Sequence, residues 1–252
     1  MSTESITWSV LGEKAAGTSH NGRGTPCQDA FAYRTFGVYG EWLVVAVADG
    51  AGTASHSEIG SVLACEELVK RVENGEPKIL SFHEEALSVF HGVRTVLIAE
   101  AERLQVRPRE LACTLLLAVV GPDGATFAQV GDGAIVFHDG LAYQTAFWPE
   151  PSEYANATDF LTDDNYANAF RHSAVTLAIC DLAIFTDGIQ RLALDFGAKR
   201  PYAEFFGPLF RAIKTSAQPE TLSVALAGFL NSPRINERTD DDKTLVLAVR
   251  LP

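Results

Sequence analysis

The stretch Trp42-Leu-Val-Val-Ala-Val-Ala-Asp49-Gly-Ala-Gly52 decides the fold of this 252-residue chain. Its first seven residues form a continuous apolar run, which is typical of a strand buried on both faces. The run ends abruptly at Asp49, which glycines follow. Because a strand buried on both faces needs a covering layer on each side, the stretch predicts a layered fold with a carboxylate at the end of a central strand.

The segments on either side of this stretch extend the same pattern. Ala30–Phe36 is predicted to be the hairpin partner of the strand Trp42–Ala48. After the Asp-Gly loop, Glu58–Val72 and Ser81–Gln105 carry apolar residues at helical spacing over several turns. The order of the chain is therefore a hairpin followed by two long helices.

The second half of the chain returns to strands, with Asp-Gly turns between apolar runs that indicate hairpins. Further strands are predicted at Ile6–Leu11, Cys113–Val120, Thr126–Val130, Ala134–His138, Leu141–Thr145 and Thr244–Val249, a strand pair at Val175–Ile179 and Leu182–Phe185, and helices at Tyr202–Ile213 and Pro219–Leu230. This order favours an α+β fold of two stacked antiparallel sheets with helices outside. Neither a repeat nor a linker divides the chain, so we expect a single domain over residues 1–252.

Composition excludes several classes of protein. The formal net charge of −12 leaves no basic footprint for nucleic acid. The sequence contains neither an apolar run long enough to span a bilayer nor a signal peptide at its start, so we expect a soluble cytoplasmic protein without membrane contact. Four scattered cysteines lack the spacing of a zinc site and are expected to be reduced thiols.

Five aspartates share one local context, because each lies at the end of a predicted strand beside a glycine or another small or polar residue. They are Asp29, Asp49, Asp132, Asp187 and Asp241. Strand ends meet at the edge of a sheet, so these carboxylates can come together, and mutual repulsion would then raise their pKa values. Mg²⁺ or Mn²⁺ would remove that cost, since both prefer oxygen ligands. Any one Asp-Gly pair can also be a simple turn, and this alternative stays open for each aspartate.

The same residues resemble the ordered motifs of a known family, the PPM or type-2C metal-dependent serine/threonine protein phosphatases. The motifs are Asp29-Ala, Val47-Ala-Asp49-Gly-Ala-Gly, Gly131-Asp132-Gly, Thr186-Asp187-Gly and Asp241-Asp242-Lys-Thr244. The similarity runs from about Trp8 to Val249, and the departures from the pattern suggest the compact bacterial branch. The resemblance implies an αββα sandwich with a binuclear Mg²⁺/Mn²⁺ centre between the sheets.

The resemblance also implies a role for each motif residue. Asp49 would bridge two ions, Asp187 and Asp241 would serve one of them, Asp29 and the Gly50 carbonyl the other, and Asp132 with Asp187 a weaker third ion. It implies hydrolysis of phosphoserine and phosphothreonine by direct attack of a water that bridges the ions, with Asp49 and Asp187 acting through metal-bound water. Two ions can activate such a water and clamp the phosphoryl oxygens, so no cysteine or serine nucleophile is required.

Three positions depart from the family pattern. Where the family usually has an arginine for the substrate phosphate, this chain has Gly24, with Arg23 as the neighbouring candidate. Ala51 stands where many members carry a histidine proposed as general acid, and His56 is a nearby substitute or an ordinary loop residue. Gln28 replaces the usual glutamate.

The irregular segment Phe147–His172 is predicted to be a mobile flap over or beside the site, or a surface loop without a role. We expect a monomer that acts on phosphoproteins and is paired with a serine/threonine kinase. The alternatives are a catalytically weak regulatory or pseudo-phosphatase module that binds a partner, and a phosphatase of small phosphorylated metabolites. The intact set of aspartates argues against the binding module, which has no need of them.

Overall fold

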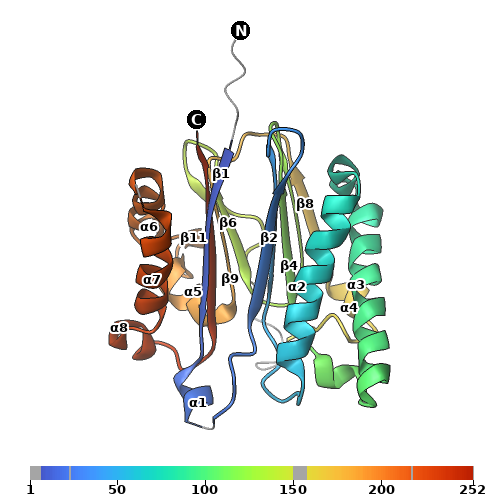
Figure 1. The fold of residues 1–252 in the computed structure, drawn as a ribbon. Coiled ribbons are helices and arrows are strands. Elements are labelled where there is room, and N and C mark those ends of the chain that lie inside the picture. Colours follow the sequence, from blue (N-terminus) through green and yellow to red (C-terminus); the bar gives the residue numbers. More distant parts are fainter. Residues whose placement is uncertain (1–6, 23, 150–157, 217, 252) are drawn as a thin grey trace.

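Two five-stranded antiparallel sheets lie face to face, and helices cover their outer faces (Figure 1). The structure is a computed structural model and describes residues 7–22, 24–149, 158–216 and 218–251. The predicted α+β fold of two stacked sheets with outer helices, the αββα sandwich, is confirmed. None of the helices in the described part of the chain has the length and apolar character that a bilayer-spanning segment requires.

The first sheet has the strand order β1-β12-β9-β6-β7 and the second β2-β3-β4-β5-β8. The first sheet contains β1 (Thr7–Ala15), β6 (Ala134–His138), β7 (Tyr143–Thr145), β9 (Asp181–Phe185) and β12 (Lys243–Leu251). The second contains β2 (Ala30–Phe36), β3 (Trp42–Ala48), β4 (Leu115–Val120), β5 (Ala125–Val130) and β8 (Arg171–Val175). A separate small sheet joins β10 (Leu194–Asp195) to β11 (Arg200–Pro201).

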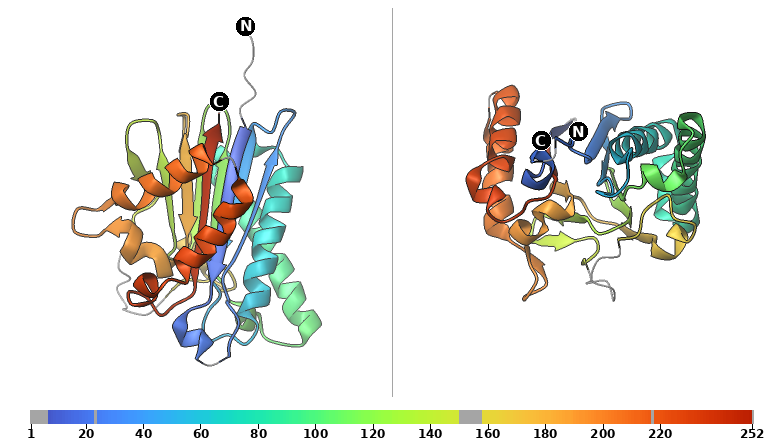
Figure 2. Two further views of the ribbon diagram at one scale, coloured as in Figure 1. Left: turned by 60° about the vertical axis from the view of Figure 1, so that its left-hand side comes forward. Right: turned by 90° about the horizontal axis from the view of Figure 1, so that it is seen from below.

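The helices form two outer layers, seen edge-on in Figure 2. On the second sheet lie α2 (Ser57–Asn74) and α3 (His83–Leu104), with the short 3₁₀ helices η1 (Pro77–Ser81) and η2 (Pro108–Leu111) and the short helix α4 (Tyr166–Ala169). On the first sheet lie α5 (Asp187–Ala193), α6 (Ala203–Thr215) and α7 (Pro219–Leu230), followed by α8 (Pro233–Asn236). The short helix α1 (Thr18–Asn21) lies beyond the end of β1.

β3 shows why the fold needs its layers. Leu43, Val45 and Val47 pack into the core between the two sheets, whereas Val44 and Ala46 pack against α2 and α3 on the opposite face. All five side chains are fully buried. The prediction that the run Trp42–Ala48 is covered on both faces is therefore confirmed in the structure.

The chain changes sheets between β5 and β6, where the Gly131-Asp132-Gly133 loop connects the two layers. Gly131 has a φ of +105°, and a Cβ there would lie 2.4 Å from the Thr114 side chain. Only glycine accepts this conformation without strain. The crossing places Asp132 between the ends of both sheets.

One strand pairing predicted from the sequence is wrong. β8 ends at Val175, and its partner is β5 of the second sheet, whereas β9 pairs with β6 and β12 of the first. The apolar residues Leu177 and Ile179 belong to the connection between the sheets and pack into the core between them. Apolar spacing made this connection look like a strand, because burial between sheets gives the same pattern as a strand.

The segment Phe147–His172 is only partly irregular. It includes α4 and the first residues of β8, and Tyr166 and Phe170 pack in the core beneath α3. Residues 150–157 lie outside the described residues. The prediction that the whole segment is irregular is therefore wrong for Tyr166–His172, where Tyr166 and Phe170 are buried. A mobile flap formed by the rest of the segment stays a prediction.

Candidate metal centre

Three aspartates come together between the ends of the two sheets. Asp49 follows β3, Asp132 lies on the crossing between the sheets, and Asp187 begins α5 just after β9. Each offers one carboxylate oxygen, and these three oxygens all lie within 4.8 Å of one another. Asp132 and Asp187 follow Asp49 by 83 and 138 residues along the chain, yet all three carboxylates come together in space. The sequence predicted this meeting of carboxylates at strand ends.

Asp29 lies just outside this group of three and is almost completely buried. Its Oδ2 accepts a hydrogen bond of 2.8 Å from the Thr186 hydroxyl, and its backbone carbonyl accepts one of 2.5 Å from Lys14 Nζ. Burial raises the pKa of Asp29 to about 7, although hydrogen bonds from hydroxyl groups oppose the shift. The residue thus occupies the second sheet's side of the centre, next to Thr186 from the first sheet.

The pKa shifts of Asp49 and Asp187 show which other aspartates lie close enough to repel them. Burial first, and then the charges of Asp29, Asp187, Asp241 and Asp132, raise the pKa of Asp49 well above its ordinary value. Burial followed by repulsion from Asp132 and Asp241 raises the pKa of Asp187 to about 7. All five predicted aspartates therefore belong to one electrostatic group, although Asp241 is exposed and lies outside the tight group of three.

Several carboxylate oxygens in this cluster are buried without a hydrogen-bond partner among the described residues. They are Oδ1 of Asp29, Oδ1 of Asp132 and Oδ1 of Asp187. A buried, unpaired carboxylate oxygen is costly, and a divalent cation satisfies it. Because the donor set consists of carboxylates, the residues present fit Mg²⁺ or Mn²⁺ better than a softer metal.

The loop after β3 is held in place by the neighbouring chain. The Asp49 N–H donates to Thr114 Oγ1 at 2.9 Å, and the Thr114 N–H donates to the Asp49 carbonyl at 2.8 Å. A Cβ on Gly50 would lie 2.6 Å from the carbonyl oxygen of Gln28, so only glycine fits beside that backbone. Gln28 itself is buried, as is its neighbour Asp29, so the loop that carries both residues is tightly packed.

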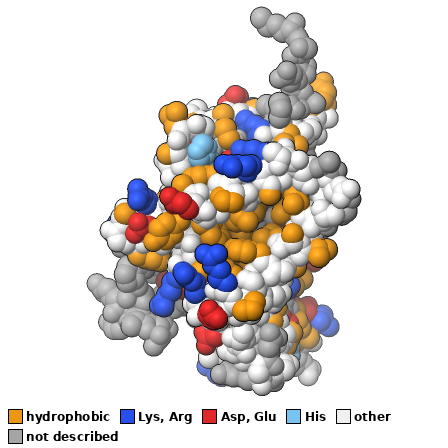
Figure 3. Space-filling model, turned by 90° about the vertical axis from the view of Figure 1, so that its left-hand side faces the viewer, with side chains coloured by type: hydrophobic (Ala, Val, Ile, Leu, Met, Phe, Trp, Pro, Cys, Tyr) orange, Lys and Arg blue, Asp and Glu red, His pale blue; other side chains and the backbone are white. Residues whose placement is uncertain are grey.

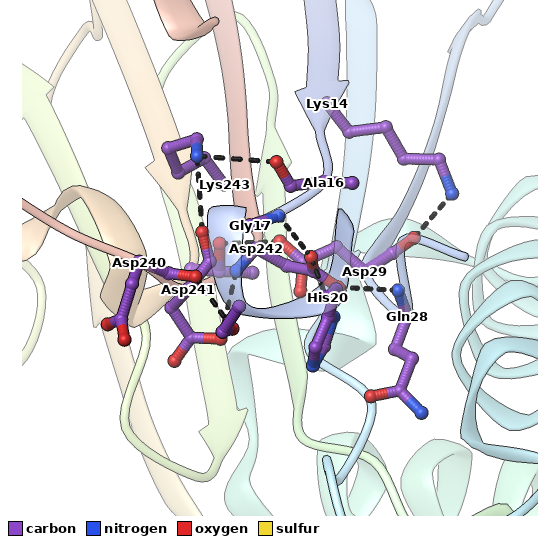
Figure 4. Close-up of polar contacts among 12 residues, drawn as sticks. Lys14, Ala16, Gly17, His20, Gln28, Asp29, Asp240, Asp241, Asp242 and Lys243 are labelled. Carbon is purple, nitrogen blue, oxygen red and sulfur yellow. Dashed lines mark hydrogen bonds and ion pairs between the residues drawn. The ribbon is translucent and has the colours of Figure 1, made fainter. Parts of the chain in front are cut away.

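Asp242 is a residue of this region that sequence reasoning missed. Its carboxylate accepts hydrogen bonds from the backbone N–H of Gly17 at 2.7 Å and of Gln28 at 2.6 Å (Figure 4). Nδ1 of His20, on α1, lies 2.9 Å from Asp242 Oδ1. Asp242 therefore fastens the segments that precede Asp29 to the segment that carries Asp241. Its partners are more than 200 residues away, so no local pattern could have indicated this role.

Lys243 fixes the backbone of the same segment from the other side. Its Nζ donates to the Asp241 carbonyl at 3.2 Å (Figure 4). It also donates to Asn236 Oδ1 at 3.1 Å. Burial lowers the pKa of Lys243. The side chain of Asp241 is exposed, but the contacts of its buried neighbours Asp242 and Lys243 fix the position of its backbone.

The described end of the predicted flap segment lies beside the cluster. The Thr158 hydroxyl donates to Asp132 Oδ2 at 2.8 Å, and the Leu161 N–H donates to the Cys113 carbonyl at 2.9 Å. Phe160 packs against a small apolar group that includes Ala51. The segment therefore contacts both an aspartate of the cluster and the loop after Asp49.

The histidine and arginine candidates have different outcomes. Arg23 lies outside the described residues. Ala51 is buried in the small apolar group against which Phe160 packs, so no general acid stands at this position. Nδ1 of His56 lies 2.8 Å from the Ser55 hydroxyl, at the start of α2. His20 also lies near the loop after Asp49, because a Cβ on Gly52 would lie 4.0 Å from its Nε2.

The fold and the carboxylate cluster define a class of αββα proteins whose site lies at one end of the sheets, between them. The sequence model of the family described as protein phosphatase 2C matches residues 16–231. Serine/threonine-protein phosphatase 3 of Escherichia coli strain K12 is 38% identical over 253 residues, covering 97% of this chain and 99% of that protein. The chain therefore belongs to the protein phosphatase 2C family.

Solved structures show the same fold at low sequence identity. Serine/threonine phosphatase Stp1 from Staphylococcus aureus superimposes with a TM-score of 0.62 at 14% identity, covering 96% of this chain and 95% of that one. RsbX in complex with magnesium gives a TM-score of 0.58 at 15% identity, covering all of this chain and 98% of that one. At such low sequence identities, these similarities show a shared fold and nothing more.

Proposed function

We infer that this protein is a Mg²⁺- or Mn²⁺-dependent phosphatase that hydrolyses phosphoserine and phosphothreonine in proteins. The observation that carries the inference is the group of buried carboxylate oxygens without partners between the two sheets, at Asp29, Asp132 and Asp187. Membership of the protein phosphatase 2C family and the similarity to a serine/threonine-protein phosphatase of Escherichia coli support the same substrate class.

The ligand set that we propose follows the cluster. Two cations would be held by Asp29, Asp49, the Gly50 carbonyl, Asp187 and Asp241, and a weaker third by Asp132 with Asp187. When bound, the cations activate a water for attack on phosphorus and neutralise charge on the phosphoryl oxygens. Hydrogen bonds within the chain hold the proposed ligands in position. Thr114 fixes the loop that carries Asp49, and Thr186 orients the Asp29 carboxylate. Asp242 joins the segment that carries Asp241 to the backbone of Gln28.

The cellular setting that we propose is the cytoplasm, with a serine/threonine kinase that makes the phosphoesters. The four cysteines are free thiols, which fits a reducing compartment. We also propose that the protein acts as a monomer, as one domain over residues 1–252. Size-exclusion chromatography with light scattering tests the oligomeric state directly.

The test of this function is hydrolysis by the purified protein with Mn²⁺, Mg²⁺ or excess chelator. A phosphothreonine peptide, p-nitrophenyl phosphate and a sugar phosphate serve as substrates. We expect metal-dependent release of phosphate from the peptide and from the aryl phosphate. Full activity in excess chelator would overturn the metal assignment, and turnover of the sugar phosphate alone would overturn the assignment to proteins.

A further inference from the structure

A hollow of about 410 Å³ lies on the outer face of the first sheet's helical layer, between α6, α7 and α8. Its apolar lining includes Phe205 and Leu209 of α6, Phe229 of α7 and Ile235 of α8. Figure 3 shows hydrophobic side chains gathered over the middle of this face, with basic side chains at their border. The volume is that of a site for a small ligand or for a few side chains of a peptide.

The apolar lining is incompletely covered in the described structure. Phe205, Leu209 and Phe229 are each only partly buried, and Tyr202 at the edge is 38% exposed. Contiguous exposed apolar surface beside polar residues marks an interaction site more often than a chance surface.

The charge at the rim is opposite to the charge of the whole protein. Arg234 on α8 and Arg238 just after it line the hollow, and both are exposed. Neither arginine forms an ion pair with a described residue. Glu204 of α6 is the acidic residue among those that line the hollow. In a chain with a net charge of −12, this rim favours a partner that carries carboxylates beside apolar side chains.

Short stretches of chain connect two residues that line the hollow to aspartates of the candidate metal centre. Leu192 in its wall belongs to α5, which begins at Asp187. Five residues of helix correspond to about 7.5 Å. On the other wall, Arg238 is three residues before Asp241, a span of at most about 11 Å in extended chain. A peptide bound in the hollow thus needs about three or more extended residues to reach the aspartates.

We propose that this hollow docks a segment of the phosphoprotein substrate in which apolar side chains alternate with glutamate or aspartate, several residues from the phosphorylated serine or threonine. The proposal rests on the phosphatase function inferred above and adds a determinant of substrate choice. The apolar side chains fill the space between Phe205, Leu209 and Phe229, and the carboxylates meet Arg234 and Arg238. Docking raises the concentration of the phosphoester at the aspartates without changing the chemistry there.

The experiment uses two phosphothreonine peptides that differ only in a distal segment. In both peptides six residues separate the phosphothreonine from a segment containing leucine and phenylalanine, which carries glutamates in one peptide and lysines in the other. We expect the full-length protein to show a kcat/KM about tenfold higher for the glutamate peptide. The double variant Arg234→Glu/Arg238→Glu should lose or reverse that preference, while its hydrolysis of p-nitrophenyl phosphate stays unchanged.

The matched control is Arg211→Glu, which reverses an exposed arginine of α6 that does not line the hollow. This variant should keep the preference for the glutamate peptide. Equal kcat/KM for the two peptides with the unaltered protein would overturn the proposal. An equal loss on both peptides and on p-nitrophenyl phosphate in the double variant would also overturn it, because that loss indicates a structural defect.

A binding measurement separates docking from catalysis. Fluorescence anisotropy of the unphosphorylated glutamate segment should give a dissociation constant that the double variant weakens about tenfold. If the protein hydrolyses nothing yet binds this segment in a charge-dependent manner, the docking surface stands and the phosphatase function fails. If the double variant changes the sedimentation of the protein while segment binding stays the same, the hollow is a contact between copies of this chain and the proposal is overturned.

Discussion

Two sets of buried carboxylate oxygens lie within one region of this protein and have opposite surroundings. The carboxylate of Asp242 is 2% exposed and is saturated by two backbone N–H groups and a nearby imidazole. Asp132 and Asp187, by contrast, each keep a buried oxygen without a partner among the described residues. The first arrangement stabilises the fold by itself, whereas the second is complete only when a cation supplies the missing charge.

The contrast teaches that position within a motif does not reveal the role of an acidic residue. Asp241 and Asp242 are adjacent, but the first is exposed toward the cluster and the second is buried as an anchor. Stability and activity should therefore respond in opposite ways to mutations in the two sets.

The largest expected effect is on activity. Asp187→Asn or Asp49→Asn removes a carboxylate from the group of three, and loss of several kcal/mol of transition-state stabilisation corresponds to a fall in kcat/KM of about a thousandfold or more. In the metal-free protein the same change relieves repulsion, so the variant should be no less stable than the unaltered protein. Steady-state kinetics with p-nitrophenyl phosphate and urea denaturation test both statements. Retention of a tenth or more of the activity would contradict the assignment.

The next effect concerns the anchor. Asp242→Ala leaves the N–H groups of Gly17 and Gln28 without their acceptor, which should lower the free energy of unfolding by about 2–5 kcal/mol. Urea denaturation in the presence of chelator measures this loss. His20→Gln is the matched control, since it keeps the carboxylate and both backbone contacts and should cost less. A loss in His20→Gln as large as in Asp242→Ala would show that the imidazole contact, and not the two N–H groups, is the main contribution.

Metal binding should also distinguish the cluster aspartates from the anchor Asp242. Mn²⁺ at about a hundredfold excess over its dissociation constant should raise the free energy of unfolding by about 2.7 kcal/mol. Asp187→Asn should reduce this increment, whereas His20→Gln should retain it. Thermal denaturation at increasing Mn²⁺ concentration follows the effect. An identical shift in the Asp187 variant would place the bound metal elsewhere.

The last prediction concerns the dependence of stability on pH. The pKa values of Asp29 and Asp187 are raised to about 7 in the folded protein, above those of the unfolded chain. The unfolded chain therefore loses these protons first, so the free energy of unfolding of the metal-free protein should fall as the pH rises from about 4 to about 7. Denaturation curves at several pH values should show a weaker fall for Asp187→Asn than for the unaltered protein. An equal or steeper fall in the variant would mean that other groups dominate.

Regular periodicity made most elements predictable. β2, β3, β6 and α7 begin and end at the predicted residues, because their apolar pattern coincides with their burial. Local patterns also identified the five aspartates, since each follows or precedes a strand beside a small or polar residue. The roles of the individual ligands stay predictions, and Arg23 lies outside the described residues.

Features that depend on distant partners could not be predicted from local patterns. The anchoring role of Asp242 could not be seen in the sequence, because its contacts with Gly17 and Gln28 exist only after distant parts of the chain come together. The connection after β8 looked like a strand because the gap between the sheets buries Leu177 and Ile179 as a sheet would. In both cases tertiary structure, not local preference, decides the role of the residue.

The place of β12 has a consequence for synthesis of the protein. β12 lies between β1 and β9 in the first sheet, so β1 has no neighbour in that sheet until residues 243–251 have been made. At about 5–20 residues per second, the ribosome needs roughly 10–50 s to pass from β1 to β12. Asp241 and the anchor Asp242 also emerge only then. A nascent chain would thus carry an open sheet edge and an incomplete centre, and would become competent only when its final strand is inserted.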